Sequence, residues 1–130
     1  MPLVCPTCKA PALDVPLFLE FPPDGGSDEV TLQTVSCERC GFAGVGLYEE
    51  SRRGPLGRES VHHVGWHLTR AEMEKLSALM RTCSDPGNLR CQCTAHLVLG
   101  KRDPSNSWDG LRQNGYVLGD WFRIDYVHKA

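Results

Sequence analysis

The chain lacks the features of a membrane protein or a secreted protein. No part of its 130 residues is an apolar run long enough to span a bilayer, which takes about 20 residues. The first residues, Met1 to Cys5, have no basic segment followed by an apolar one, as a secretory signal requires. Seven cysteines, an odd number, do not suit a disulfide framework. The sequence therefore predicts a cytoplasmic protein with reduced cysteines and no membrane partner.

A surplus of basic residues is also missing. Lysine and arginine total 14 against 16 acidic residues, for a formal net charge of −2. The charge is uneven: residues 1–40 carry two basic and six acidic side chains, whereas residues 76–130 carry seven basic and five acidic ones. A phosphate backbone would be repelled by the N-terminal segment, so any contact with nucleic acid is expected from the later residues.

Two cysteine pairs dominate the first third of the chain. Cys5-Pro-Thr-Cys8 and Cys37-Glu-Arg-Cys40 each fit a tight turn, and residues 9–36 separate them. Residues 13–21 are rich in strand formers and residues 29–36 alternate as in a strand, with a turn sequence at 22–28 between them. Pairing these strands as a hairpin would bring the cysteines together. Four thiolates are a ligand set that tetrahedral Zn²⁺ prefers, so a first zinc ion is predicted here.

On these cysteines, and on Gly41 after the second pair, residues 5 to about 48 resemble a zinc ribbon. That family of two-knuckle modules, built from short β-hairpins, is found in proteins of transcription, translation and the ribosome. The resemblance implies a structural zinc module. The pattern is also similar to rubredoxins, which hold iron and carry electrons, but they usually have glycine after both pairs. Here Lys9 follows Cys8, and zinc is the preferred metal.

The remainder of the chain combines strands with one clear helix. Thr69 and Glu72 form a capping-box pattern, and apolar residues then recur with helical spacing to Cys83, which predicts a helix over about 69–83. Residues 42–48, 61–67 and 121–128 are expected to be strands, and residues 101–114 to be a long loop. In the strand 61–67, His62 and His63 would point to opposite faces and would not bind one ion together.

A second set of metal ligands is predicted where this helix ends. Cys83, Cys91, Cys93 and His96 lie within fourteen residues, and three cysteines with a histidine form a known structural zinc set. Two alternatives remain: Cys83 is a buried apolar residue, or His62, His63 or His67 replaces one of the ligands. With only three protein ligands, such an ion would keep a water position, and zinc-dependent hydrolysis would become an alternative function.

The basic loop at residues 51–58 is a candidate contact for a partner or for nucleic acid. It contains Arg52, Arg53 and Arg58. The leading interpretation is a zinc-binding protein that acts as a protein-interaction or assembly module, with a protein partner. A zinc-ribbon protein that binds nucleic acid is the alternative, and a zinc hydrolase or a rubredoxin-like iron carrier is the third. No catalytic residue is assigned, because the His-x-Glu and Pro-Cys-x-x-Cys motifs of zinc deaminases are absent.

The expected fold class is α+β. Residues 1–50 would form the zinc ribbon of antiparallel strands. Residues 51–130 would form an α+β unit with the capped helix, C-terminal antiparallel strands and the second zinc site. One continuous domain is the alternative to two units.

Overall fold

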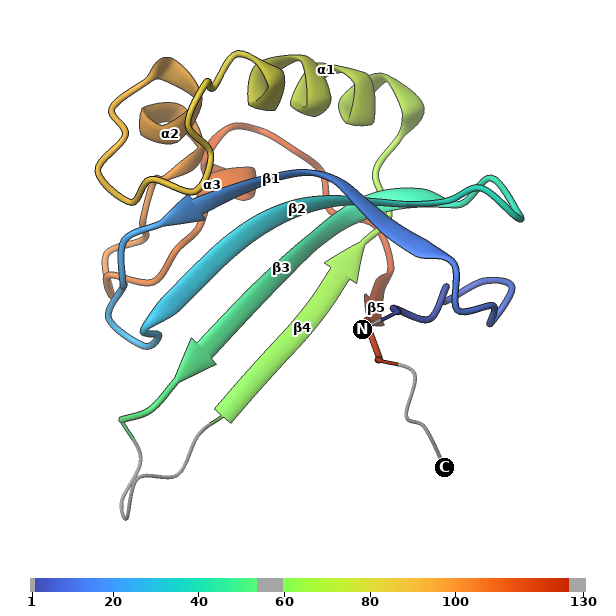
Figure 1. Ribbon diagram of the computed structural model, residues 1–130. Helices are drawn as coiled ribbons and strands as arrows, with labels where there is room; N and C mark the ends of the chain where they lie inside the picture. The colour runs from blue at the N-terminus through green and yellow to red at the C-terminus, as the bar shows by residue number, and fades with distance from the viewer. Residues whose placement is uncertain (1, 54–59, 127–130) are drawn as a thin grey trace.

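A computed structural model describes residues 2–53 and 60–126, which form a five-stranded antiparallel sheet with three helices (Figure 1). The strands follow one another in the order β1-β2-β3-β4-β5, each paired with its neighbours in sequence. The helices lie on one face of the sheet, with α1 across it and α2 and α3 near one end (Figure 1). The predicted α+β class with antiparallel strands is confirmed.

Strands β1 (Leu13–Phe21) and β2 (Glu29–Cys37) form the predicted hairpin. Pro16 cannot donate a backbone hydrogen bond, and it is found on an edge strand at a break in the register between Asp14 and Leu17. Beyond the break, Leu19 and Leu32 pair directly and are fully buried toward the helices. The alternation of the sequence thus sets which side chains enter the core.

Strands β3 (Ala43–Ser51), β4 (Ser60–Trp66) and β5 (Trp121–Arg123) complete the sheet. Gly65 of β4 pairs with Phe122 of β5, whose ring lies against it. A Cβ atom at Gly65 would be 2.5 Å from that ring, so a side chain at this position would displace β5. The strand expected over 121–128 is shorter than predicted: β5 ends at Arg123, and residues 127–130 lie outside the described part of the chain.

Helix α1 (Arg70–Arg81) begins and ends close to the predicted bounds of 69–83. The Thr69 hydroxyl accepts a hydrogen bond from the Glu72 amide, and the Glu72 carboxylate accepts one from the Thr69 amide, which is the predicted capping box. Leu76 and Met80 are buried against the sheet.

Two short helices follow that the sequence did not indicate. Helix α2 (Thr94–Leu99) and helix α3 (Gly110–Gln113) have six and four residues. The prediction of a continuous loop over 101–114 is therefore wrong for 110–113. Periodicity cannot identify helices this short, because they span fewer than two turns. No helix in the described ranges is long and apolar enough to cross a bilayer.

In the described part of the chain, the buried apolar residues form two clusters. The larger one lies between the sheet and the helices and includes Leu19, Leu32, Leu76, Leu99 and Leu111. The smaller one joins the first cysteine turn to the C-terminal segment, and its buried members are Leu3, Cys5, Leu13, Val35, Cys37, Phe42, Phe122 and Ile124. Leu3 forms isolated β-bridges with both Leu13 and Tyr126, so the start of the chain lies between β1 and the residues after β5.

Candidate metal centres

The first centre brings together the four cysteines of the two predicted knuckles. Cys5 and Cys8 lie before β1, Cys37 is the last residue of β2, and Cys40 lies in the turn to β3. Their sulfur atoms all lie within 4.8 Å of one another, with Cys5 to Cys40 at 3.6 Å and Cys8 to Cys37 at 3.7 Å. Tetrahedral zinc with bonds of about 2.3 Å would separate its sulfur ligands by about 3.8 Å. The group could therefore hold one tetrahedral metal ion.

Both knuckles turn in the same way. The amide of Lys9 donates to the Cys5 carbonyl, and the amide of Gly41 donates to the Cys37 carbonyl. Lys9 has a φ of 64° and Gly41 a φ of 78°, so both residues adopt the left-handed conformation that glycine tolerates best. Lys9 therefore takes the backbone shape of the glycine that rubredoxin-like knuckles usually have there, and its side chain does not prevent the turn.

The first centre is half enclosed. Cys5 and Cys37 are buried in the smaller core cluster, whereas Cys8 and Cys40 are exposed. Burial raises the pKa of Cys5, but hydrogen bonds from the backbone of Cys8 and Thr7 outweigh it and lower the pKa to about 7. A hydrogen bond from the Phe42 backbone lowers the pKa of Cys40, but partial desolvation of its sulfur and hydrogen bonds with the neighbouring cysteines outweigh it and raise the pKa to about 12. Sulfur atoms this close ionise together only beside a positive charge, as a metal ion supplies.

The second centre contains Cys83, Cys91, Cys93 and His96, whose ligand atoms also lie within 4.8 Å of one another. Cys83 follows α1, Cys91 and Cys93 lie in the next loop, and His96 is in α2. The Nδ1 atom of His96 is 3.3 Å from the sulfur atoms of both Cys83 and Cys93, and Cys83 is 3.9 Å from Cys91. These distances are close to the roughly 3.6 and 3.8 Å of a tetrahedral zinc site.

The orientation of the His96 ring is set from outside the centre. Its Nε2–H donates to the backbone carbonyl of Glu20 in β1, at 3.0 Å. This leaves Nδ1, which faces the cysteines, with the lone pair that a metal needs. The Glu20 amide donates to the carbonyl of Pro86, in the loop between Cys83 and Cys91. The backbone of one β1 residue therefore fixes both the loop and the histidine.

Cys93 also begins helix α2. As its N-cap residue, it accepts a hydrogen bond through sulfur from the amide of His96, at 3.4 Å. Burial raises the pKa of Cys93, but hydrogen bonds to its sulfur, the strongest of them from the His96 amide, outweigh burial and lower the pKa to about 6. Burial raises the pKa of Cys83 to about 11, with Cys93 and Cys91 adding to the effect. The donor set of the second centre, like that of the first, suits a divalent cation.

The other predicted histidines lie apart from both groups. His63 is buried and His62 is exposed, as expected for neighbours on a strand. His67 packs with the rings of Phe42 and Phe122 at 5.3 Å. Among the described residues, both groups that could hold a metal consist of the predicted ligands, and none of these three histidines belongs to either.

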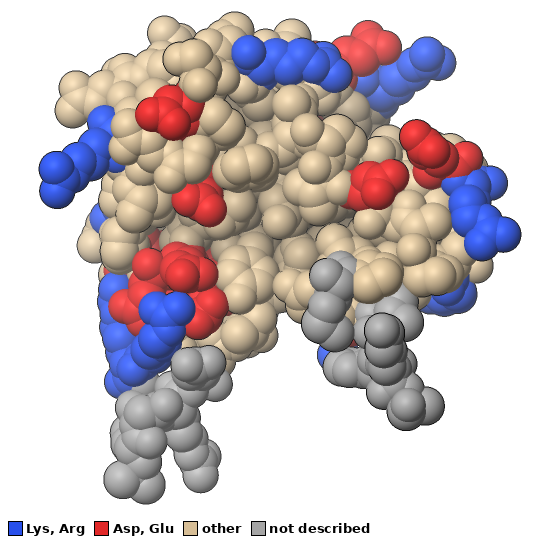
Figure 2. All heavy atoms as spheres, viewed as in Figure 1, with Lys and Arg blue, Asp and Glu red and all other residues tan. Residues whose placement is uncertain are grey.

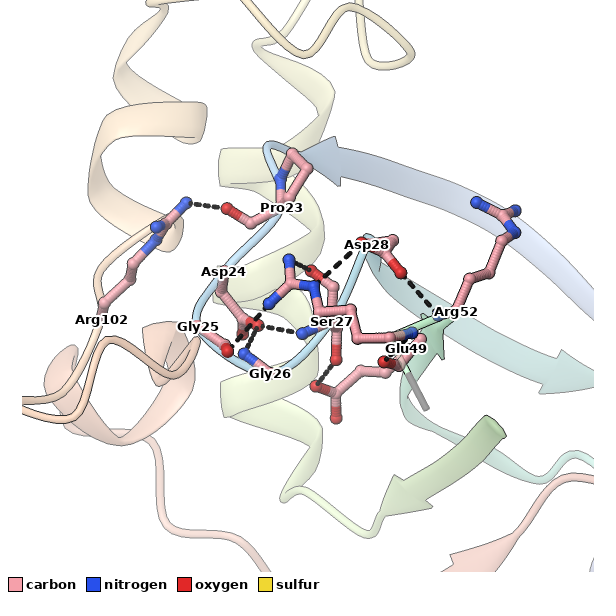
Figure 3. Close-up of polar contacts among 11 residues, drawn as sticks. Pro23, Asp24, Gly25, Gly26, Ser27, Asp28, Glu49, Arg52 and Arg102 are labelled. Atoms are coloured by element: carbon pink, nitrogen blue, oxygen red, sulfur yellow. Dashed lines mark hydrogen bonds and ion pairs between the residues drawn. The ribbon is translucent and has the colours of Figure 1, made fainter. Parts of the chain in front are cut away.

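Arg52 and Arg53 both form ion pairs with acidic side chains of the same chain. Arg52 forms ion pairs with Glu29 and Glu50, at 3.2 and 2.7 Å. Arg53 pairs with Asp28 at 3.0 Å and donates to the carbonyls of Gly25 and Ser27. The two arginines thus hold the turn between β1 and β2, together with the contacts drawn in Figure 3. Arg58, the third predicted contact, lies outside the described residues.

Two features of the centres have no sequence signal. The carbonyl of Glu20 is a backbone group, so its contact with His96 is independent of residue type. The left-handed turn at Lys9 is hidden because lysine is not typical of that conformation, although the matching position in the second knuckle, Gly41, points to it.

Comparison of the chain with protein-family models, with curated proteins and with solved structures finds no match.

Proposed function

We propose that this protein binds two structural zinc ions and acts as a protein-interaction or assembly module. The observation that carries the proposal is the completeness of both donor sets. Each has four converging donors, Cys₄ in one group and Cys₃His in the other. Structural zinc has four protein ligands, whereas catalytic zinc keeps one position for water or substrate. Two closed sites support a structural role over zinc-dependent hydrolysis.

The proposal includes the zinc-ribbon resemblance of residues 5–48. It is supported by a β-hairpin, β1–β2, that carries the two knuckles at its outer end. Pairing of β3 with β4 from Val45 to Ser51 favours one continuous domain over separate units at 1–50 and 51–130. A cytoplasmic location is part of the proposal, because thiolate ligands for zinc require reduced cysteines and all seven are free.

A protein partner is favoured over nucleic acid by the surface. Arg52 and Arg53, which were candidates for phosphate contacts, pair with carboxylates of the same chain. On the face drawn in Figure 2, acidic and basic side chains are interspersed around the margin and the centre is uncharged. Several large apolar side chains are well exposed instead, among them Leu97, Val117 and Trp121 at 62%, 74% and 64%. Exposed apolar side chains suit protein contacts better than phosphate contacts.

Metal analysis of the purified full chain tests the structural part of the proposal. We expect two zinc ions per chain, and one per chain in a Cys93→Ser variant. Cobalt substitution should give the absorption of tetrahedral thiolate sites, and that absorption should fall in the variant. One zinc per chain in the unaltered protein would contradict the second site. A red-brown protein containing iron would replace zinc with a rubredoxin-like centre.

Salt dependence separates the two kinds of partner. Binding to a protein partner, found by crosslinking, should weaken much less with added salt than binding to nucleic acid, because its apolar contacts are not screened. Binding to nucleic acid would weaken steeply, because each neutralised phosphate releases counterions. Retention on heparin at low salt, together with loss of retention in the triple variant Arg52→Ala, Arg53→Ala, Arg58→Ala, would favour the nucleic-acid alternative.

A further inference from the structure

A hollow beside the second centre combines apolar walls with basic side chains. Its volume is about 270 Å³, and Pro22, Leu89, Arg90, Leu97 and Arg102 are among the residues that line it, together with the ligands Cys91 and His96. Leu89 is 44% exposed and Leu97 is 62% exposed. Two leucines this accessible at one hollow are an apolar contact surface of the kind that anchors a partner's side chain.

The charges of this hollow have no carboxylate partners. Within the described ranges, no ion pair joins Arg90 to an acidic side chain. The guanidinium of Arg102 donates to the carbonyls of Pro22 and Pro23 and to the side chain of Asn106, and the contact with Pro23 is seen in Figure 3. Three thiolates and one zinc ion would carry a single negative charge. The two guanidinium groups would exceed it, so the hollow is cationic.

On the other side of Leu89 the charge changes sign. Leu89 also lines a smaller hollow of about 130 Å³, together with Glu20, Asp28 and Glu29. Asp28 and Glu29 form ion pairs with Arg53 and Arg52, whereas no ion pair within the described residues involves Glu20. A ligand with carboxylates would be attracted on the side of Arg90 and Arg102 and repelled on the side of Glu20. The distribution of charge around Leu89 would therefore orient a bound acidic ligand.

We propose that this hollow is a docking surface for an acidic segment of a partner protein. The segment places a large apolar side chain between Leu89 and Leu97, and its carboxylates face Arg90 and Arg102. This inference rests on the proposed role in protein interaction and identifies where and with what chemistry it occurs. A nucleic-acid phosphate would satisfy the arginines but would leave both leucines in water, so a protein segment is the occupant.

The walls of the docking surface are held by the second centre. Leu97 is in α2, one residue after His96, and Leu89 lies in the loop between Cys83 and Cys91. Metal binding would fix both elements before the partner arrives, since a closed metal site restrains the loops that supply its ligands. A surface fixed in advance loses less conformational entropy on binding.

Selection from a random peptide-display library on the full-length, zinc-loaded protein tests the proposal. We expect enriched peptides that combine aspartate or glutamate with leucine or phenylalanine. A labelled enriched peptide should bind Leu97→Ser about tenfold more weakly than it binds the unaltered protein. The loss of affinity in Arg90→Glu should be about tenfold or greater. Val117→Ser, which alters another well-exposed apolar residue, and Arg112→Glu are matched controls that should change affinity less than about twofold.

Absence of enrichment, enrichment of basic peptides, or unchanged affinity in Leu97→Ser would each overturn the docking surface. Stronger binding of a single-stranded oligonucleotide than of any selected peptide, lost in Arg90→Glu, would assign the surface to nucleic acid instead. Zinc content, measured for every variant, separates this test from the proposed function. Two zinc ions without peptide binding would reject only the surface, whereas peptide binding by a chain with fewer ions would reject only the two-zinc assignment.

Discussion

At the scale of single residues, His63 is a buried histidine that packs among polar and aromatic side chains. Its Nε2–H donates to the side-chain oxygen of Gln33 at 2.6 Å, and the rings of Tyr48 and Tyr126 are 5.4 and 6.2 Å away. Burial lowers the pKa of His63 from 6.5 to about 4. The imidazole is therefore neutral in the folded protein at neutral pH, and protonation would place a charge in a desolvated position.

We expect His63 to make the fold less stable in acid. Its folded pKa lies below its unfolded pKa, so the unfolded chain binds more protons between these values. The contribution of neutral His63 to the free energy of unfolding is complete above pH 6.5 and is lost as the pH falls toward about 4. The slope of this loss is at most about 1.4 kcal/mol per pH unit. Denaturant unfolding across this range should show a smaller slope for His63→Gln than for the unaltered chain. Since acid also competes for zinc ligands, the difference between the two proteins is the quantity to compare; equal slopes would exclude His63 as the cause.

At the scale of elements, the parts that could be predicted are those with a long pattern or strong end signals. Strands β1 and β2 each have nine residues rich in strand formers, and α1 has a complete capping box. Helix α2 is capped instead by the sulfur of Cys93, which is not among the residues preferred at that position. The end of β5 at Arg123 depends on tertiary contacts of the following residues with Leu3 and Val4, which no local pattern contains.

The members of the two candidate metal centres were predictable from the sequence, but the surroundings of these centres were not. Cysteine spacing alone selects the four members of the first group. In the second group, spacing left three other histidines as alternatives, and only the fold separates them from Cys83 and its neighbours. The tie between His96 and the carbonyl of Glu20 joins residues 76 positions apart, so it could be found only from the structure.

This tie predicts that the second centre protects the edge of β1. On that edge, the Glu20 amide donates to Pro86 and the Glu20 carbonyl accepts from His96. In a Cys93→Ser variant with one zinc per chain, the 83–96 segment should separate from β1 more often, because it would lose the restraint of the ion. Hydrogen exchange followed by NMR should then be faster for the Glu20 amide.

The Leu32 amide, in the neighbouring strand β2, provides the internal control for this experiment. It lies within the sheet, so its exchange should report global unfolding and change less than that of Glu20. If both amides accelerated equally, the variant would be unfolding as a whole, and the idea of local protection by the second centre would be wrong.

At the scale of the whole molecule, the two ends of the described chain complete the smaller core. Leu3 is 8% exposed and bridges Leu13 to Tyr126, while the Val4 amide donates to the carbonyl of Asp125 at 2.9 Å. Leu3 and Val4 directly precede Cys5, so the same residues hold both the first centre and the C-terminal segment in place. The first knuckle therefore contributes to the packing of β5 as well as to the possible metal site.

Truncating the Leu3 side chain should destabilise the whole fold. Leu3→Ala removes buried methyl groups beside Phe122 and Ile124, and we expect it to lower the free energy of unfolding by about 2 to 4 kcal/mol. Val117→Ala, which truncates a side chain that is 74% exposed, should change it by less than about 0.5 kcal/mol. Urea unfolding of both variants measures the difference, and zinc content shows whether the first centre still forms. A Leu3→Ala protein as stable as the Val117→Ala protein would mean that the ends of the chain do not stabilise the sheet.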